Sequence, residues 1–182
     1  MVLPTPDLDE WLPDPQVTTR HRVSAEADAD ALWRAAETVR LGDAPILGQA
    51  VRWRIPGTAP DLLFRDLFRQ YPFAMIDEGP RWSVSGMCGR IWTLQRDYPR
   101  IESAEDFLAW DERDTVRVLL AHWIEGAAPG RNALVSEARI KPVDGQARLR
   151  LRALWAVLGH LEHLVGGEAL PVAARRADRG EV

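Results

Sequence analysis

The chain has 182 residues, enough for one domain with a sizeable core and too few for two roomy ones. Hydrophobic residues make up 46% of it and charged residues 27%, a composition typical of a globular protein rather than a disordered or fibrous one. The formal net charge of −4 at pH 7 argues against a nucleic-acid partner, because proteins that bind nucleic acids concentrate positive charge to meet the phosphates.

Missing motifs exclude several further kinds of site. A single cysteine cannot form an internal disulfide, and no run of about 18 apolar residues could insert into a membrane. The sequence also lacks a CxxC pair, a phosphate-binding loop ending in Gly-Lys-Ser or Gly-Lys-Thr, and the GxGxxG and GxSxG motifs. Because no secretion signal is recognisable either, we expect a cytoplasmic protein without a cofactor.

The first half of the chain predicts alternating strands and helices. Residues 1–15 hold four prolines among acidic residues, a composition that resists helix and strand and predicts a flexible tail. Residues 16–24 are rich in β-branched residues with period-2 alternation and predict a strand, after which Asp28 caps a short helix. Residues 51–55 alternate apolar side chains with arginines and predict a second strand, and a second short helix is expected over 58–71.

The second half predicts a meander of strands followed by a long helix. Most of the links between the strands are shorter than the dozen residues that a parallel crossover needs, so the strands should be antiparallel. An apolar stripe predicts a helix over 145–165, and the charged residues 171–182 predict a second flexible tail. The five strand-like runs are 73–79, 81–93, 107–114, 115–126 and 131–143.

This order of elements predicts an α+β fold with helices on one side of an antiparallel sheet, in a single domain over residues 16–170. With this order of elements, the chain resembles the SRPBCC superfamily, which has the helix-grip fold of START domains, pollen-allergen-type proteins and polyketide cyclases. The resemblance is carried by HRVSAEADADALW, by GRIW, by ALVSEARIKPVD and by ARLRLRALWAVLGHLEHLV. It implies a curved sheet of about six or seven strands wrapped around a long C-terminal helix, with two short helices.

A narrower resemblance lies in SEARIKPVDGQARLRLRALW, which looks like the Thr-Glu-Thr-Arg stretch of uncharacterised bacterial members of the superfamily. Glu137 and Arg139 match that stretch, whereas Ser136 and Ala138 replace its threonines. Those relatives usually have two adjacent helices after the first strand, whereas the pattern here predicts a strand over 51–55 between them.

The resemblance implies a cavity between the sheet and the C-terminal helix that holds an apolar ligand, such as a lipid or a polyketide. Alternation along a strand puts Cys88 on one face with Gly86, Arg90 and Trp92, as a cavity wall rather than a nucleophile, since free cysteine usually behaves as a small buried hydrophobe. The ligand-binding candidates are Trp82, Cys88, Arg90, Trp92, Trp110, His122 and Trp155.

Three residues are candidates for catalysis. His122 shares a strand face with apolar residues and is either a poised general base or a hydrogen-bonded core histidine. Glu137 and Arg139 also share a face, where they either grip a polar ligand head or form an ion pair at the rim of the sheet. His160 and His163 stand three apart on the helix, but without a third ligand we expect no metal there.

Three functions follow from these patterns. The leading hypothesis is the binding of a hydrophobic or aromatic small molecule, with no catalysis assumed. One alternative is a polyketide cyclase or dehydratase-like enzyme that uses His122 with Glu137 or Arg139. Another is a protein-interaction module, in which the acidic, proline-rich N-terminal tail with Trp11 contacts a partner. The sequence leaves the oligomeric state open, a homodimer included.

Overall fold

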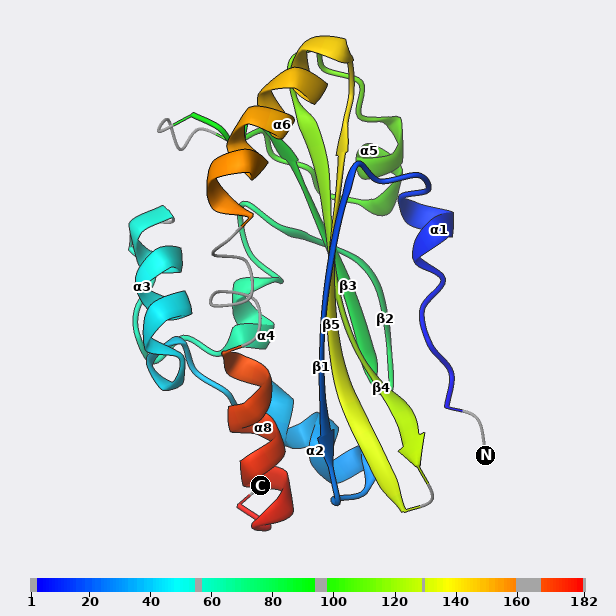
Figure 1. Ribbon diagram of the computed structural model, residues 1–182, viewed down its shortest axis with the longest axis vertical. Coiled ribbons are helices and arrows are strands. Elements are labelled where there is room, and N and C mark those ends of the chain that lie inside the picture. Colours follow the sequence, from blue (N-terminus) through cyan, green and yellow to red (C-terminus); the bar gives the residue numbers. More distant parts are fainter. Residues whose placement is uncertain (1–2, 55–56, 94–97, 129, 160–167, 182) are drawn as a thin grey trace.

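The computed structural model describes residues 3–54, 57–93, 98–128, 130–159 and 168–181. Its centre is a curved, open sheet of five antiparallel strands in the order β1-β5-β4-β3-β2 (Figure 1). Four of the five predicted runs in the second half are strands, as is the first predicted strand. The strands are β1 (Val17–Ala25), β2 (Ala74–Gly79), β3 (Trp82–Gly89), β4 (Val116–Ala128) and β5 (Arg131–Pro142).

Several helices begin where the sequence supplies a capping side chain. At the start of α2, Asp28 Oδ1 accepts a hydrogen bond from the Ala31 amide at 2.8 Å, as predicted for this N-cap. Asp144 Oδ1 does the same for the Ala147 amide at 2.8 Å at the start of α6. The described helices are α1 (Leu8–Trp11), α2 (Ala29–Glu37), α3 (Pro45–Arg54), α4 (Phe64–Leu67), α5 (Ala104–Ala109), α6 (Gly145–Leu158) and α8 (Ala169–Asp178), with a 3-10 turn over Leu41–Asp43.

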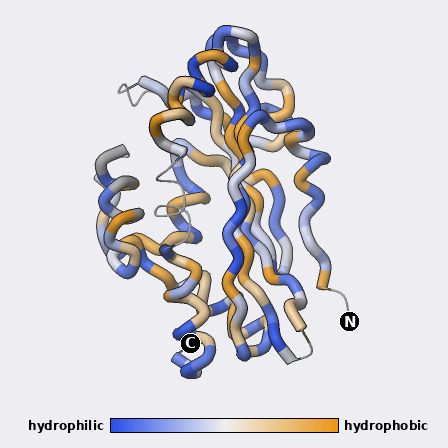
Figure 2. The backbone as a smooth tube through the Cα atoms, in the orientation of Figure 1, coloured by the Kyte–Doolittle hydropathy of each residue, from blue (hydrophilic) through white to orange (hydrophobic). Residues whose placement is uncertain are grey.

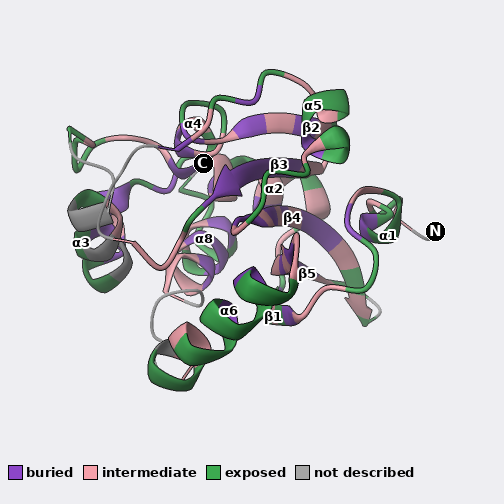
Figure 3. Cartoon of the chain, turned by 90° about the horizontal axis from the view of Figure 1, so that it is seen from above, coloured by how far each residue is buried: buried purple, intermediate pink, exposed green. Residues whose placement is uncertain are grey.

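Helices cover both faces of the sheet. Helices α2, α3, α4, α6 and α8 lie on one side, and α1 and α5 lie on the other (Figure 1). Seen from above, buried residues gather on β3 and β4 in the middle of the sheet, whereas α6 is largely exposed (Figure 3). The tube in Figure 2 shows hydrophobic and hydrophilic positions mixed along the strands rather than confined to one end of the molecule.

The inner face of the sheet is the one that presents His122, Ile124, Leu134 and Ser136 toward α2 and α8. Because successive side chains of a strand point to opposite faces, Ile124 and Leu134 meet the buried residues of these two helices. The resulting core also holds Leu32, Ala35, Leu170, Ala173, Ala174 and Ala177. Under α6, a separate cluster on the same face joins Val118, Ile140, Leu151 and Trp155.

The outer face presents Val84, Leu119, Ala121, Val135 and Glu137. Its apolar residues pack against Phe107 of α5 and against Leu8 and Leu12 of the N-terminal segment. Phe107 and Leu12 are both 0% exposed. The outer face is therefore a second core layer rather than a solvated surface.

Two predicted strands are wrong, because both segments form helices. The described part of 51–55 is the last turn of α3, which begins at Pro45, a residue whose fixed φ suits a first helical position. The first part of 107–114 belongs to α5, where Ser103 and Asp106 form a reciprocal capping box. Short alternating runs do not distinguish a strand from a helical turn, and the deciding caps lie outside those runs. The sheet consequently has five strands, not six or seven.

Both termini differ from the flexible tails that composition predicts. Leu8 and Leu12 of the N-terminal segment are buried, and α8 contributes Leu170 and Ala173 to the core. The first part of the long helix predicted over 145–165 corresponds to α6, which has Gly159 as its C-cap. Residues 160–167 lie outside the described part of the chain. The predicted second helix over 58–71 contracts to α4.

Candidate functional site

A pocket of about 240 Å³ lies between the inner face of the sheet and helices α2, α4 and α8. None of the lining residues that the structure describes belongs to α6, although the resemblance placed the cavity under a long C-terminal helix. Its walls come from segments far apart in the sequence, so its shape depends on how the helices pack. It is lined by Thr19, His21, Trp33, Ala36, Glu37, Val39, Phe64, Arg65, Phe68, Arg69, Met75, Ser83, Leu120, His122, Leu134, Ser136, Ala138, Ala169, Leu170 and Ala173.

The floor of the pocket carries a row of polar side chains across four strands. His21 of β1 pairs in register with Ser136 of β5, Ser136 pairs with His122 of β4, and His122 pairs with Ser83 of β3. All four residues line the pocket and are half-buried. Side chains of directly opposed residues on one face lie about 5 Å apart at their Cβ atoms. We call these four residues the polar row.

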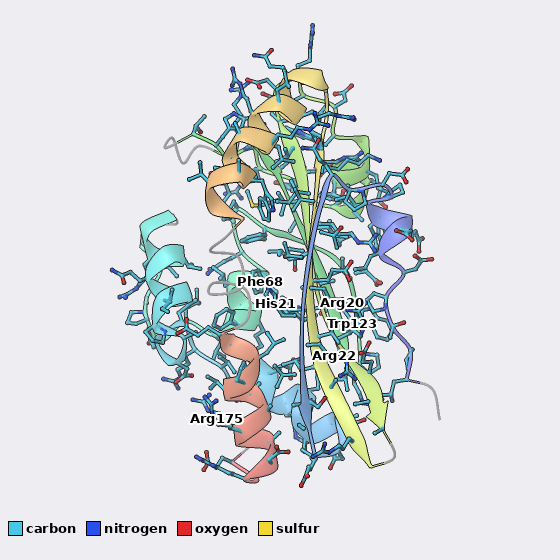
Figure 4. All side chains as sticks on the ribbon, in the orientation of Figure 1. Arg20, His21, Arg22, Phe68, Trp123 and Arg175 are labelled. Atoms are coloured by element: carbon cyan, nitrogen blue, oxygen red, sulfur yellow. The ribbon has the colours of Figure 1, made fainter. Side chains whose placement is uncertain are left out.

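Aromatic rings form the wall opposite the floor. The Phe68 ring lies 5.1 Å from the His122 ring between centroids and 5.3 Å from Phe73, which it meets edge-on. Phe64 lies 6.2 Å from Phe68 on the other side. Such separations are within the range in which aromatic pairs attract each other. Through the Phe68 ring, the aromatic wall therefore contacts the polar row. In Figure 4, His21 and Phe68 lie on the same side of the sheet.

Charged side chains of the pocket come from the helix wall, not from the floor. Arg65 Nη1 lies 3.9 Å from Glu37 Oε1, and Arg65 Nε lies 3.5 Å from Asp66 Oδ1. Arg69 forms an ion pair with Glu78. Both arginine side chains are more than 40% exposed, at 48% and 41%. The pocket thus combines a charged wall near solvent with a floor that contains no aspartate, glutamate, lysine or arginine among the lining residues that the structure describes.

The pKa of His122 is lowered by its surroundings. Burial disfavours the charged imidazolium and lowers the pKa of His122 from 6.5 to about 4. At neutral pH the ring is therefore uncharged, with one nitrogen that donates a hydrogen bond and one that accepts. His122 is a hydrogen-bonding group of the floor rather than a cation.

Of the seven ligand-binding candidates from the sequence, the pocket brings in His122 alone. Trp82 and Cys88 lie with the outer-face cluster, and Trp110, at the end of α5, donates from Nε1 to Thr115 Oγ1 at 3.0 Å there. Burial raises the pKa of the Cys88 thiol to about 12. The prediction that Cys88 shares a face with Gly86 holds, but that face is turned toward α5.

The other three candidates lie near α6, away from the pocket. Arg90 pairs with Glu112 at 3.4 Å and Asp114 at 3.6 Å. The Arg150 guanidinium lies 5.9 Å from the Trp92 ring, and Trp155 packs in the cluster under α6.

Glu137 and Arg139 lie on the outer face, and the sheet separates them from His122. Arg139 Nε donates to Glu137 Oε1 at 2.7 Å, and Arg139 Nη1 donates to Asp9 Oδ1 at 2.5 Å. Arg20, Arg22 and Trp123 are on this side too (Figure 4). The proposed cyclase-like mechanism requires His122 to converge with Glu137 or Arg139, and they do not converge.

Sequence reasoning missed most of the residues that line the pocket floor. His21, Ser83 and Ser136 each stand in a predicted strand, so their alternation could have placed them on a face. Their meeting in one row depends on strand register, which no local pattern states. Phe68 stood in the helix predicted over 58–71, without any signal that it faces a cavity.

Neither a metal-binding cluster nor a membrane-spanning helix is found in the part of the chain that the structure describes. His160 and His163 lie outside the described residues. Among those described, no group of three or more His, Cys, Asp or Glu residues could hold a metal ion. The described helices are all too short or too polar to cross a membrane.

Comparisons with known proteins identify no family: no protein-family model and no curated protein matches the sequence. Among solved structures, a hypothetical protein from Helicobacter pylori is 9% identical with a TM-score of 0.39, over 93% of each chain. A protein from Thermobifida fusca is 18% identical with a TM-score of 0.38, over 89% of this chain and 93% of that one. The Zhui aromatase/cyclase from Streptomyces sp. R1128 is 16% identical with a TM-score of 0.31, over 88% and 94%. Similarity at this level is a distant one in fold and says nothing about activity or ligand.

Proposed function

We propose that the protein binds a small hydrophobic or aromatic molecule in the pocket between the sheet and helices α2, α4 and α8. The observation that carries the proposal is the meeting of an aromatic wall, built by Trp33, Phe64 and Phe68, with a floor of polar side chains. Small-molecule sites are concave, mostly apolar, and hold a few polar groups that orient the ligand. The pocket has each of these properties.

The volume of the pocket limits the size of the ligand. An apolar cavity of about 150 Å³ holds benzene, whereas drug-sized ligands occupy about 300–1,000 Å³. The pocket, at about 240 Å³, lies between these values. We therefore expect a compact skeleton, such as a fused bicyclic aromatic, rather than a lipid with two long chains.

Binding is better supported than acid–base catalysis. A general base works best when its pKa lies near the working pH, and the pKa of His122 is about 4. The other two candidates, Glu137 and Arg139, are engaged in an ion pair on the outer face. A cytoplasmic location and the oligomeric state stay predictions.

A variant that fills the pocket tests the proposal. Ala138 lines the pocket, and Ala138→Leu replaces its methyl group with an isobutyl group that occupies part of the cavity. We expect naphthalene to raise the midpoint of thermal unfolding of the wild type and to give a saturable calorimetric signal. Both effects should be lost in Ala138→Leu.

The matched control is Ala153→Leu, the same change on the exposed side of α6. It should bind naphthalene as the wild type does. A folded wild type that shows no saturable binding of naphthalene or of its polar derivatives, or an Ala138→Leu variant that binds naphthalene unchanged, would contradict the proposed function.

A further inference from the structure

The polar row contains hydrogen-bonding groups that the protein itself does not use. Within the described residues, no hydrogen bond joins the side chains of Ser83, His122 or Ser136 to another protein group. Each of the three is half-buried and lines the pocket. Their donors and acceptors therefore face the cavity.

Such groups are costly to leave unsatisfied once water is removed. A hydroxyl or an imidazole moved from water into an apolar environment gives up its hydrogen bonds to water, and the transfer is unfavourable unless a new partner replaces them. The rows on either side of the polar row contribute Leu120, Leu134 and Ala138, which offer no partner, and Thr19, whose hydroxyl stands one row away. A purely hydrocarbon ligand that displaces water from the floor would leave the side chains of Ser83, His122 and Ser136 without hydrogen-bond partners.

The chemistry of the row indicates which ligand group satisfies it. A serine hydroxyl both donates and accepts, and a neutral imidazole does the same through its two nitrogens. The charged groups of the pocket, Glu37, Arg65 and Arg69, stand on the helix side. A carboxylate at the floor would be buried without an arginine or lysine from the sheet, whereas an uncharged donor or acceptor meets complementary groups.

We infer that the pocket selects ligands whose inner end carries a hydroxyl or carbonyl group, and disfavours hydrocarbons and carboxylates built on the same skeleton. Ser83, His122 and Ser136 are the specificity-determining residues. This inference rests on the proposed function, because it names the class of ligand that the same pocket takes.

Three probes with one skeleton test the selection: naphthalene, 2-naphthol and 2-naphthoate, each titrated calorimetrically at pH 7. One good hydrogen bond contributes about 1 kcal/mol, so 2-naphthol should bind about fivefold more tightly than naphthalene. 2-Naphthoate should bind more weakly than 2-naphthol. In a Ser136→Ala/His122→Phe variant, 2-naphthol should lose its advantage over naphthalene while naphthalene still binds.

The control is Thr19→Val, which removes a hydroxyl from the pocket lining one row away from the polar row. It should keep the preference for 2-naphthol. Equal binding of naphthalene and 2-naphthol, tighter binding of 2-naphthoate, or a preference that survives in the double variant would overturn the inference and leave the proposed function standing. Failure of all three probes to bind would instead count against the proposed function.

Discussion

Arg139 and Glu137 form a buried ion pair on the outer face, with 2.7 Å between Arg139 Nε and Glu137 Oε1. Glu137 is 5% exposed, and its other oxygen lies 3.7 Å from Arg20 Nη1. Arg139 also donates to Asp9 and to the Leu12 carbonyl. The pair therefore ties the N-terminal segment to the sheet, on the face opposite the pocket.

Removal of one partner should destabilise the protein more than removal of both. In Arg139→Met, Glu137 keeps only its more distant ion pair with Arg20, so we expect a loss of about 3 kcal/mol in the free energy of unfolding. The double variant Glu137→Met/Arg139→Met should lose less, because no buried charge is left. Urea denaturation measures both values.

The control for this pair is Arg131→Met, which breaks an exposed ion pair with Glu26. Its cost should stay below about 1 kcal/mol. Equal losses in the free energy of unfolding for Arg139→Met and Arg131→Met would show that the buried ion pair of Glu137 contributes no more to stability than an exposed one.

Gly86 allows α5 to approach the sheet. A Cβ atom built on Gly86 would lie 2.7 Å from the ring of Phe107, which is itself fully buried. Gly86→Ala should therefore cost about 1–3 kcal/mol by overpacking. Gly126→Ala, where a Cβ would meet nothing within 4 Å, is the matched control in strand β4 and should change stability by less than about 0.5 kcal/mol.

A second change tests whether the ring is the cause. Phe107→Leu should cost less in the Gly86→Ala background than in the wild type, because the smaller side chain relieves the contact. Strictly additive costs in a double-mutant cycle would contradict this explanation.

Cys88 should be inert in the folded protein. Burial raises the pKa of its thiol from 9.0 to about 12, and the thiolate is the reactive form. At pH 8 we expect negligible labelling by a thiol-specific disulfide reagent in native buffer and rapid, stoichiometric labelling in denaturant. Fast labelling of the native protein would mean that the outer face opens around β3.

His122 should make the protein less stable in mild acid. Its pKa is about 4 in the folded protein and about 6.5 when unfolded, so the unfolded state takes up the proton first as the pH falls. The neutral His122 ring therefore leaves the folded state at its full stability above about pH 6.5, and the folded state loses stability progressively as the pH falls toward 4. Between pH 7 and pH 5, the free energy of unfolding should fall by about 2 kcal/mol.

Comparison with His122→Gln isolates this contribution from that of the carboxyl groups, which titrate in both proteins. The variant should lose about 2 kcal/mol less than the wild type over the same pH interval. Parallel pH profiles of the two proteins would contradict burial of the neutral ring.

Much of the fold could be predicted because its strands and caps are local. The alternation in residues 16–24 and 115–126 placed β1 and β4 correctly, and Asp28 began α2 as expected. The failures also have local causes. At 51–55 the alternating run was too short to separate strand from helix, and at 107–114 the capping box of Ser103 and Asp106 lay upstream of the run.

The candidate site could be predicted only in part, and Cys88 shows the reason. Alternation correctly put Cys88 and Gly86 on one face of β3, but it could not tell which face the pocket would occupy. The choice depends on α5 covering the outer face through Phe107 while α2 and α8 cover the inner one. The same arrangement puts Glu137 on the outer face and His122 on the inner face, with the sheet between them.

By itself, the sequence determined the five strands that form the sheet, which of their residues share a face, and that the fold is α+β, because these properties arise from periods of two and from capping side chains within a few residues. The tertiary structure alone decided that His21, Ser136, His122 and Ser83 stand in one row beneath Phe68. Strand register joins residues more than a hundred positions apart, and it is set by the packing of both faces at once rather than by any local pattern.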